Sequence, residues 1–173
     1  MNVLGRWAKP ILVGQLVTLR PLDASDTDAM WEMVNDPLGN DLTATTSRFT
    51  YDQIEAWCSS RIDQDERLDL AIVENSTGLF AGEVVLNEFD VRTNSVNFRI
   101  SLRAPAWFGR GLGTEAIQLI VDHALRTLEV SALKLEVLER NERARWVYEK
   151  VGFRESGEFV DDDESWIRME LNR

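Results

Sequence analysis

The segment that decides the fold is Trp107-Phe108-Gly109-Arg110-Gly111-Leu112-Gly113-Thr114-Glu115-Ala116. Three glycines alternate with other residues just before an apolar-periodic stretch that is typical of a helix. Glycine allows successive backbone N–H groups to point into one concavity, because no Cβ blocks it. A helix that begins behind this concavity adds unpaired N–H donors and the positive end of its dipole. The segment predicts a phosphate-binding loop; a glycine-rich turn that only caps the helix is the alternative.

Two common phosphate-binding motifs do not fit this segment. A P-loop requires a lysine before Ser or Thr, whereas here Gly113 is followed directly by Thr114 and Glu115. A dinucleotide fingerprint G-x-G-x-x-G would place its third glycine at Thr114 and would lie early in a βαβ unit. More than half of the chain precedes the loop. The pyrophosphate of another cofactor is therefore the ligand that we expect.

The composition predicts one soluble, acidic domain. The chain has 173 residues, of which 44% are hydrophobic and 28% charged. No apolar stretch approaches the ~20 residues that span a bilayer, and residues 1–7 lack the pattern of a signal peptide. We therefore expect a cytoplasmic protein. The net charge of −11 argues against nucleic-acid and anionic-membrane binding. It suits a cationic substrate such as an amine, although acidity would equally keep the protein in solution.

Single cysteine and histidine residues restrict the chemistry further. Cys58 is the only cysteine, which excludes an internal disulfide and a cysteine-based zinc site. His123 is the only histidine, which excludes multi-histidine metal sites. Its apolar neighbours predict a packed side chain rather than a catalytic base. We expect no metal.

The order of predicted elements is β-α-α-β-β-β-α-β-α-β-β. Strand patterns cover 16–20, 68–73, 79–86, 95–102, 133–138, 153–160 and 166–171, and helix patterns cover about 25–36, 50–62, 114–128 and 141–151. Capping-box pairs predict two helix starts, at Ser25 with Asp28 and at Thr50 with Gln53. The polar stretch 36–48, the acceptor segment, is expected to be a substrate loop.

This order predicts a mixed α/β fold. A doubly wound arrangement does not fit, because strands and helices do not alternate from the start. We expect a single domain over residues 16–173, with a mixed, mostly antiparallel sheet and helices on both faces. Residues 1–15 would form an N-terminal extension.

A second informative segment is Asn141-Glu142-Arg143-Ala144-Arg145-Trp146-Val147-Tyr148-Glu149-Lys150-Val151-Gly152-Phe153. Taken singly, Asn141 could be a helix N-cap, Tyr148 a core aromatic and Gly152 a helix stop. Together with the glycine loop and the element order, the segment resembles the acyl-CoA-dependent N-acetyltransferases of the GNAT superfamily. Their motifs are Q/R-x-x-G-x-G/A and N-x-x-A/S-x-x-x-Y-x-K-x-G-F.

The resemblance covers the chain from about Leu16 onward. Gly111 and Gly113 occupy the glycine positions of the first motif, whereas Phe108 stands where Gln or Arg is usual. The residues around the loop resemble the branch that contains the ribosomal-protein N-terminal acetyltransferases. Members of the superfamily transfer an acetyl group directly from acetyl-CoA to an amine, without an enzyme-bound intermediate.

The resemblance also implies which residues bind the cofactor. Backbone N–H groups of four loop residues would hold the pyrophosphate, namely Gly111, Leu112, Gly113 and Thr114. Arg110 would be an outer charge. The pantetheine arm would lie between the strands 95–102 and 133–138, which splay apart in this family, and would bond Asn141. N–H groups freed at a bulge near Leu102 would form an oxyanion hole. Tyr148 would donate a proton or a hydrogen bond to the departing thiolate.

The base that deprotonates the amine is not given by the resemblance. Many relatives carry a glutamate at the position that matches Asn97, and an amide cannot accept a proton. If the preceding hairpin turns near Arg92, antiparallel pairing places Glu83 opposite Ser101, on the same polar face as Asn97. Glu83 is then our hypothesis for the base or for a residue that orients water. The alternative is a sheet residue paired with Arg99.

The sequence leaves three functions open. The branch resemblance favours acetylation of a protein N-terminal α-amine, and the acidic surface suits a basic target. The alternatives are acetylation of a small molecule (a polyamine, an amino acid or an aminoglycoside) and a non-catalytic acyl-CoA-binding module. Exposed tryptophans such as Trp7 or Trp166 could serve a homodimer interface, or could belong to the core.

Overall fold

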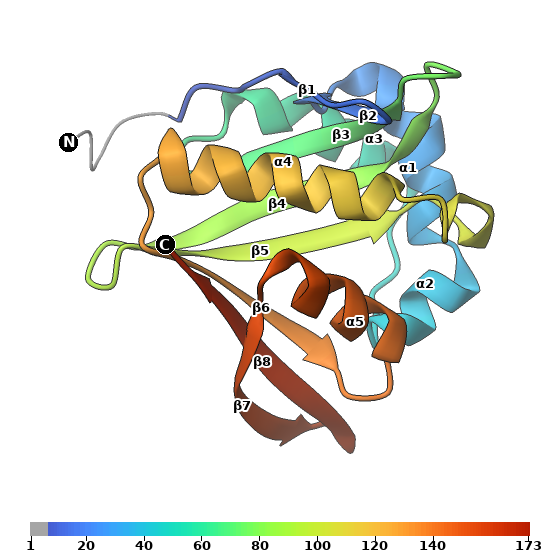
Figure 1. Ribbon diagram of the computed structural model, residues 1–173. Coiled ribbons are helices and arrows are strands. Elements are labelled where there is room, and N and C mark those ends of the chain that lie inside the picture. The colour runs from blue at the N-terminus through green and yellow to red at the C-terminus, as the bar shows by residue number, and fades with distance from the viewer. Residues whose placement is uncertain (1–6) are drawn as a thin grey trace.

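The computed structural model describes residues 7–173 as one sheet with helices on both faces (Figure 1). Residues 1–6, which make up most of the segment without a signal-peptide pattern, lie outside the described residues. The strands are β1 (Leu12–Val13), β2 (Val17–Pro21), β3 (Leu68–Glu74), β4 (Phe80–Asp90), β5 (Ser95–Leu102), β6 (Ala132–Leu138), β7 (Arg154–Asp161) and β8 (Glu164–Asn172). The helices are α1 (Thr27–Val34), α2 (Pro37–Leu42), α3 (Tyr51–Ser60), α4 (Leu112–Arg126) and α5 (Glu142–Val151). Three 3-10 turns are η1 (Ala24–Asp26), η2 (Arg61–Asp63) and η3 (Pro105–Trp107).

The sheet is almost entirely antiparallel. Its strand order is β1-β2-β3-β4-β5-β6-β8-β7. Between residues 7 and 173, β5 and β6 form the only parallel pair. A parallel pair requires a crossover connection, which α4 provides here. The predicted α/β fold with a mixed, mostly antiparallel sheet is confirmed. Strand β1 lies within the segment that was expected to be an N-terminal extension.

The helices divide the core into two apolar clusters. Helix α4 crosses one face of the sheet in Figure 1, and α1 and α3 lie behind the opposite face. The cluster under α4 includes Phe98, Ile120 and Phe153. The smaller cluster under α1 and α3 includes Met30 and Cys58. Burial raises the pKa of the Cys58 thiol to about 11, so this side chain is a packed, unreactive thiol.

The start of α1 corrects one capping prediction. The box expected at Ser25 and Asp28 is wrong, because Asp23 and Asp26 form it instead, at the start of η1. Asp23 accepts the Ser25 N–H at 2.8 Å, and Asp26 accepts the Asp23 N–H at 3.0 Å. The Ser25 hydroxyl itself donates to the Asp23 carboxylate. The α-helix therefore begins only at Thr27, after one 3-10 turn.

The acceptor segment 36–48 also differs from its prediction as a loop, because it contains helix α2. Pro37 is the first helical residue, where its missing N–H has no partner to lose. Asp36 caps the helix by accepting the Gly39 N–H at 2.7 Å. The Asp-Pro pair that follows the end of α1 thus starts a new helix.

Gly82 shows how closely β4 and β5 approach each other. A Cβ at this position would lie 2.2 Å from the carbonyl oxygen of Ser101. The register between β3 and β4 shifts beside it, between Ile72 and Val73. Glycine is therefore required here for steric reasons, at the start of β4 and beside the end of β5 that leads toward the glycine loop.

Two further observations concern other kinds of site. In residues 7–173, no helix is long and apolar enough to cross a membrane. No group of three or more His, Cys, Asp or Glu side chains in the same range could hold a metal ion. His123 lies partly buried on α4, its Nε2 atom has no hydrogen-bond partner, and desolvation lowers its pKa.

Candidate active site

Strands β5 and β6 separate along their length. They pair only through residues 95–97 of β5, although β5 continues to Leu102 and β6 to Leu138. Figure 1 shows the two strands starting side by side and then diverging. The splay expected between these strands is therefore present. It leaves the far half of one β5 edge without a neighbouring strand.

Backbone N–H groups lie along this free edge. Arg103 donates its N–H to the Ala81 carbonyl at 2.8 Å, and β4 and β5 pair without a register shift from Asn87 and Asn97 up to Gly82 and Leu102. Because N–H groups alternate between the two sides of an antiparallel strand, those of Ile100 and Leu102 point away from β4, into the opening. The bulge expected near Leu102 is wrong: the divergence of β6 exposes these groups.

The glycine loop leads directly into helix α4. Gly109 (φ +69°) and Gly111 (φ +80°) adopt the left-handed conformation that favours glycine. Gly111 is the N-cap of α4 and makes no side-chain cap. The first helical hydrogen bond runs from the Glu115 N–H to the Gly111 carbonyl, at 3.1 Å. The N–H groups of residues 112–114 precede this bond and point out of the helix end, and such a cradle can hold a phosphate group.

Arg110 is already engaged by a carboxylate. Its guanidinium pairs with Glu74 at the end of β3 and lies 5.3 Å from the centroid of the Trp107 ring. Glu74 is buried and also accepts a hydrogen bond from the Thr77 hydroxyl at 2.7 Å. Arg110 therefore fastens the glycine loop to the turn between β3 and β4.

Glu115 holds the other side of the loop. Its carboxylate accepts backbone N–H groups from Gln15 at 3.0 Å and from Leu16 and Val17 at 2.7 Å each. A Cβ on Gly14 would lie 2.5 Å from the same carboxylate. The turn between β1 and β2 is thus bound to the first turn of α4.

Asn141 and Tyr148 both lie on α5. Asn141 is the N-cap of the helix; its Oδ1 accepts the Ala144 N–H at 3.3 Å, and its Nδ2 donates to the Leu42 carbonyl at 3.2 Å. Tyr148 is buried, with its ring edge-on to Phe98 and Phe153. Burial raises its pKa to about 12, so the phenol is protonated at neutral pH. Its geometry suits a proton donor and equally suits a core aromatic.

Glu83 lies on the opposite face of the sheet from α4. It pairs with Ser101 on β5, as the sequence predicts, and with Ala71 on β3, a residue that packs under α1 and α3. The Glu83 Oε2 atom is buried and has no hydrogen-bond partner. Burial, with a contribution from Asp69, raises the pKa of the carboxyl to about 7, although Arg99 and other arginines oppose the shift. A carboxyl group with this pKa can exchange a proton at neutral pH.

Asn97, which the resemblance would place at the position of the usual base, is bound to its neighbour. Its Nδ2 donates to Asn87 Oδ1 on β4 at 2.7 Å, from the paired position. The amide pair lies on the same face as Glu83, four residues along each strand. Asn97 therefore supplies no base. Among the carboxyl groups on β4 and β5, Glu83 is the one whose pKa is raised.

The sequence matches the acetyltransferase (GNAT) domain family over residues 17–154. The chain belongs to this family. As a GNAT acetyltransferase it uses acetyl-CoA as the acetyl donor.

Two curated relatives of this GNAT protein are N-acetyltransferases. The spermidine N(1)-acetyltransferase of Escherichia coli is 30% identical over 152 residues, which cover 83% of this chain and 76% of that enzyme. The probable N-acetyltransferase YjcK of Bacillus subtilis is 30% identical over 97 residues, 56% of this chain and 54% of that protein.

Solved structures share the GNAT fold over nearly the whole chain. The spermidine N-acetyltransferase of Vibrio cholerae, in complex with CoA and spermine, superposes with a TM-score of 0.83 at 22% identity, covering 92% of this chain and 96% of that one. A GNAT-family acetyltransferase of Bacillus anthracis gives a TM-score of 0.82 at 14% identity, covering 94% and 98%.

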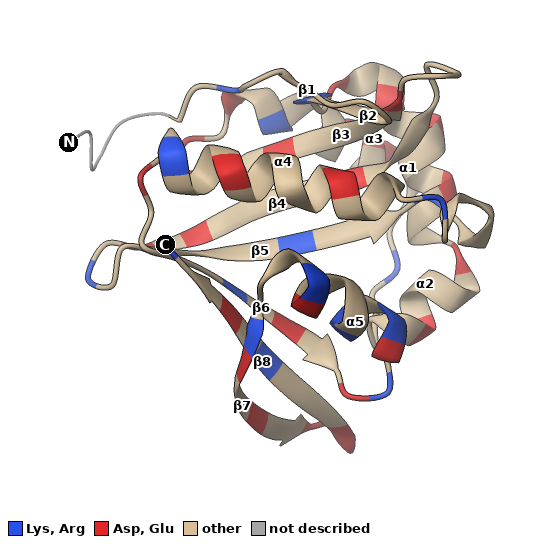
Figure 2. Ribbon diagram, in the orientation of Figure 1, with Lys and Arg blue, Asp and Glu red and all other residues tan. Residues whose placement is uncertain are grey.

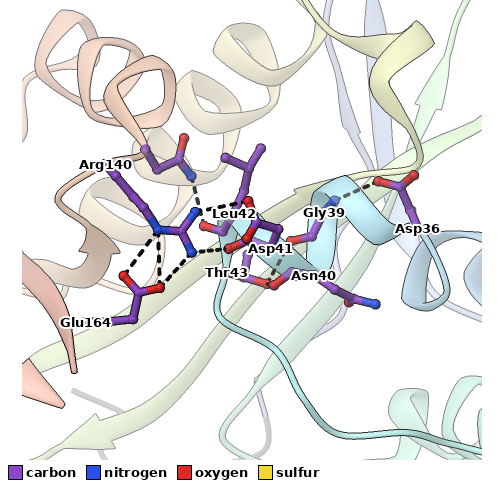
Figure 3. A network of polar contacts seen from close by, with 9 residues as sticks. Asp36, Gly39, Asn40, Asp41, Leu42, Thr43, Arg140 and Glu164 are labelled. Carbon is purple, nitrogen blue, oxygen red and sulfur yellow. Dashed lines mark hydrogen bonds and ion pairs between the residues drawn. The ribbon is translucent and has the colours of Figure 1, made fainter. Parts of the chain in front are cut away.

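Several contacts around the site of this GNAT protein were not expected from the sequence. They are the clamps of Glu115 and Glu74, and a polar network in which Arg140 joins Asp41 and Glu164 (Figure 3). Each joins residues at least 24 positions apart in the chain. The only sequence signal for them is the pair of turn glycines Gly14 and Gly111, where the β1–β2 turn and the glycine loop lie close together.

The aromatic surface also differs from expectation. Trp7 packs edge-on against Phe89, and Trp166 stacks on Phe159, so both are partly buried. The exposed tryptophan is Trp146 on α5, with 61% of its surface accessible. Figure 2 shows acidic and basic residues interspersed along α5.

Proposed function

We propose that this acetyltransferase transfers the acetyl group of acetyl-CoA to a primary amine of a small polycation of the polyamine class. The observation that carries the proposal is the 30% identity to a spermidine N(1)-acetyltransferase over 83% of the chain. The net charge of −11 suits such a substrate. This is one of the alternatives considered in the sequence analysis, and the comparisons support it better than the protein N-terminal amine favoured there.

Acetyl-CoA supplies an activated acetyl group as a thioester, and the cradle at residues 111–114 would hold its pyrophosphate. The N–H groups of Ile100 and Leu102 would stabilise the oxygen of the acetyl group as negative charge develops on it. Asn141 would reach the pantetheine arm from the N-cap of α5. Arg110 would reinforce the cradle through its contact with the loop rather than as a free charge, because Glu74 holds it.

Glu83 and Tyr148 would move the protons. A new C–N bond forms as the C–S bond breaks, so the amine loses a proton and the thiolate gains one. Glu83 would accept the amine proton, directly or through a water, from the α1 and α3 side of the sheet. Tyr148 would donate to the sulfur from α5. The two groups come from opposite faces of the sheet, which keeps the acid and the base apart.

A panel of amines tests the proposal. Purified protein with acetyl-CoA would be given spermidine, spermine, putrescine, lysine, an aminoglycoside and a peptide with a basic N-terminus, with release of free CoA thiol and product mass as readouts. We expect kcat/KM for spermidine or spermine to exceed that for the peptide by at least about a hundredfold. The same assay with Glu83→Gln and with Glu88→Gln, an exposed glutamate on the same strand, separates catalysis from charge.

The other outcomes point elsewhere. Preference for the peptide would support the protein N-terminal function. Binding of acetyl-CoA without turnover of any amine would support a non-catalytic acyl-CoA-binding module. Dimerisation, a cytoplasmic location and the domain boundary at residue 16 stay predictions from the sequence.

A further inference from the structure

Helix α2 is held by polar contacts rather than by core packing. None of its residues is buried. With six residues it is far shorter than the ~12 residues at which isolated helices begin to persist in water. Asp36 caps its start. Its other end depends on side chains from the turn between β6 and α5.

Arg140 supplies most of these contacts (Figure 3). Its Nη1 donates to Asp41 Oδ2 at 3.0 Å, and its Nη2 donates to the Asp41 carbonyl at 2.8 Å. On its other side, the guanidinium binds Glu164 at the start of β8, with the shortest contact at 2.8 Å. One planar guanidinium therefore joins α2, the β6–α5 turn and β8.

Asn141, the next residue, completes the attachment. Its Nδ2 donates to the Leu42 carbonyl at 3.2 Å. The last carbonyls of a helix have no intrahelical partners, and cationic or amide donors commonly satisfy them. Asn141 satisfies such a carbonyl at Leu42, and Arg140 adds a side-chain donor to the Asp41 carbonyl, which also accepts the Ala44 N–H at 3.2 Å. The end of α2 is thus fixed to the start of α5.

This attachment joins the two sides of the candidate active site. Helix α2 follows α1, which packs on the face of the sheet that holds Glu83. Helix α5 carries Tyr148. The acceptor segment therefore runs from the side of the expected base to the helix of the expected acid, and Arg140 sets where it arrives.

We propose that Arg140 is a positioning residue for the acceptor amine: it fixes α2 so that the acceptor segment 36–48 holds the amine between Glu83 and Tyr148. This inference rests on the proposed function, because it requires an amine acceptor. Small errors in the placement of a reacting group reduce rates strongly. A single exposed ion pair contributes little to stability, so the network is expected to act on substrate binding more than on folding.

The test compares Arg140→Gln, Asp41→Asn and the double variant with wild-type protein. Arg126→Gln is the matched control, because it removes an exposed ion pair with Asp122 on α4. We expect KM for spermidine to rise about tenfold in both single variants, and no further in the double variant, because both remove the same Arg140–Asp41 ion pair. The Kd of acetyl-CoA, measured by calorimetry, and the Tm should stay close to wild type.

Two further readouts separate positioning from a general structural effect. Hydrogen exchange of the Asn40, Ala44 and Thr45 amides, which report on α2 through their bonds at 2.8–3.2 Å, should accelerate in Arg140→Gln and not in Arg126→Gln. Arg140→Lys should restore KM only in part, because an ammonium group lacks the planar fork that bridges two carboxylates.

Unchanged exchange, an unchanged KM for the amine, or an equal loss of acetyl-CoA affinity would each overturn the inference while leaving the proposed function intact. If wild-type protein acetylates none of the amines, the proposed function itself fails. The exchange experiment, which needs no acceptor, then still shows if Arg140 holds α2.

Discussion

Glu83 on β4 lies directly opposite Ser101 on β5, and its Oε2 atom is buried without a hydrogen-bond partner. An unpaired carboxyl oxygen beside the free end of β5 is a group that a substrate proton could satisfy. Its position is the basis of our proposal that Glu83, rather than a residue at the position of Asn97, is the base. The base would be supplied by the neighbouring strand.

The first prediction concerns the pH dependence of catalysis. Because the pKa of Glu83 is about 7, kcat/KM should rise as the pH increases through about 7, where the carboxyl group loses its proton. Glu83→Gln should lower kcat/KM by about a hundredfold or more and remove this inflection. Glu88→Gln should keep both. An inflection that persists in Glu83→Gln would assign it to another group.

The second prediction uses the same shift without any substrate. The folded-state pKa of Glu83, about 7, lies above the usual value of 4.5. Between these two pH values the folded state therefore retains a proton that the unfolded state loses. Stability that Glu83 contributes at low pH is then lost as the pH rises from about 4.5 to about 7, by about 3 kcal/mol. Glu83→Gln has no such loss. Its Tm relative to wild type should therefore increase with pH, and a constant difference would contradict the raised pKa.

Much of this arrangement could be predicted from the sequence because it depends on local patterns. The alternation in Ser95–Leu102 gave the bounds of β5, and the turn near Arg92 gave the pairing of Glu83 with Ser101. The capping box of Thr50 and Gln53 marked the start of α3. Each of these signals lies within about ten residues of what it predicts.

The missed features depend on contacts between distant parts of the chain. Glu115 binds an N–H group 98 residues away, and Arg140 binds Asp41, 99 residues away. Helix α2 was predicted as a loop because its short polar sequence has no apolar face, and its stability comes from those distant side chains. The free N–H groups near Leu102 also arise from the course of another strand, β6, rather than from a local bulge.

Tyr148 provides the third prediction. Tyr148→Phe keeps the ring that packs against Phe98 and Phe153 and removes only the hydroxyl. We expect kcat to fall by about 10- to 100-fold, with the Kd of acetyl-CoA within about twofold of wild type. Tyr51→Phe, the other tyrosine of the chain, is the control. Equal kcat values for Tyr148→Phe and wild type would reduce Tyr148 to a packing role.

The fourth prediction concerns the carboxylate that binds the β1–β2 turn. Glu115→Gln loses its charge and one of the oxygens that accept three backbone N–H groups. We expect a loss of about 2 kcal/mol and a fall in Tm of about 4–8 °C. Glu142→Gln, an exposed glutamate in the first turn of α5, controls for the interaction with the helix dipole alone. Equal Tm values for the two variants would mean that the three bonds add nothing.

The fifth prediction tests the cradle for the cofactor with two matched glycines. Gly111 (φ +80°) lies in the loop, and Gly78 (φ +71°) lies in the turn between β3 and β4, where a Cβ meets no atom within 4 Å. Each Gly→Ala variant should lose about 1 kcal/mol of stability from backbone strain. Only Gly111→Ala should also weaken the binding of acetyl-CoA, because it tilts the N–H groups that precede the helix.

Thermal shift separates strain from binding in these variants. A ligand at about 100 times its Kd stabilises the folded protein by about 2.7 kcal/mol. Acetyl-CoA and desulfo-CoA should both produce this shift in wild type and in Gly78→Ala, and ATP should not. In Gly111→Ala the shift should shrink to about half or less at the same concentration, because the Kd rises at least tenfold. A full shift in Gly111→Ala would mean that the cofactor is held elsewhere, since strain alone lowers the Tm of both variants without changing their response to ligand.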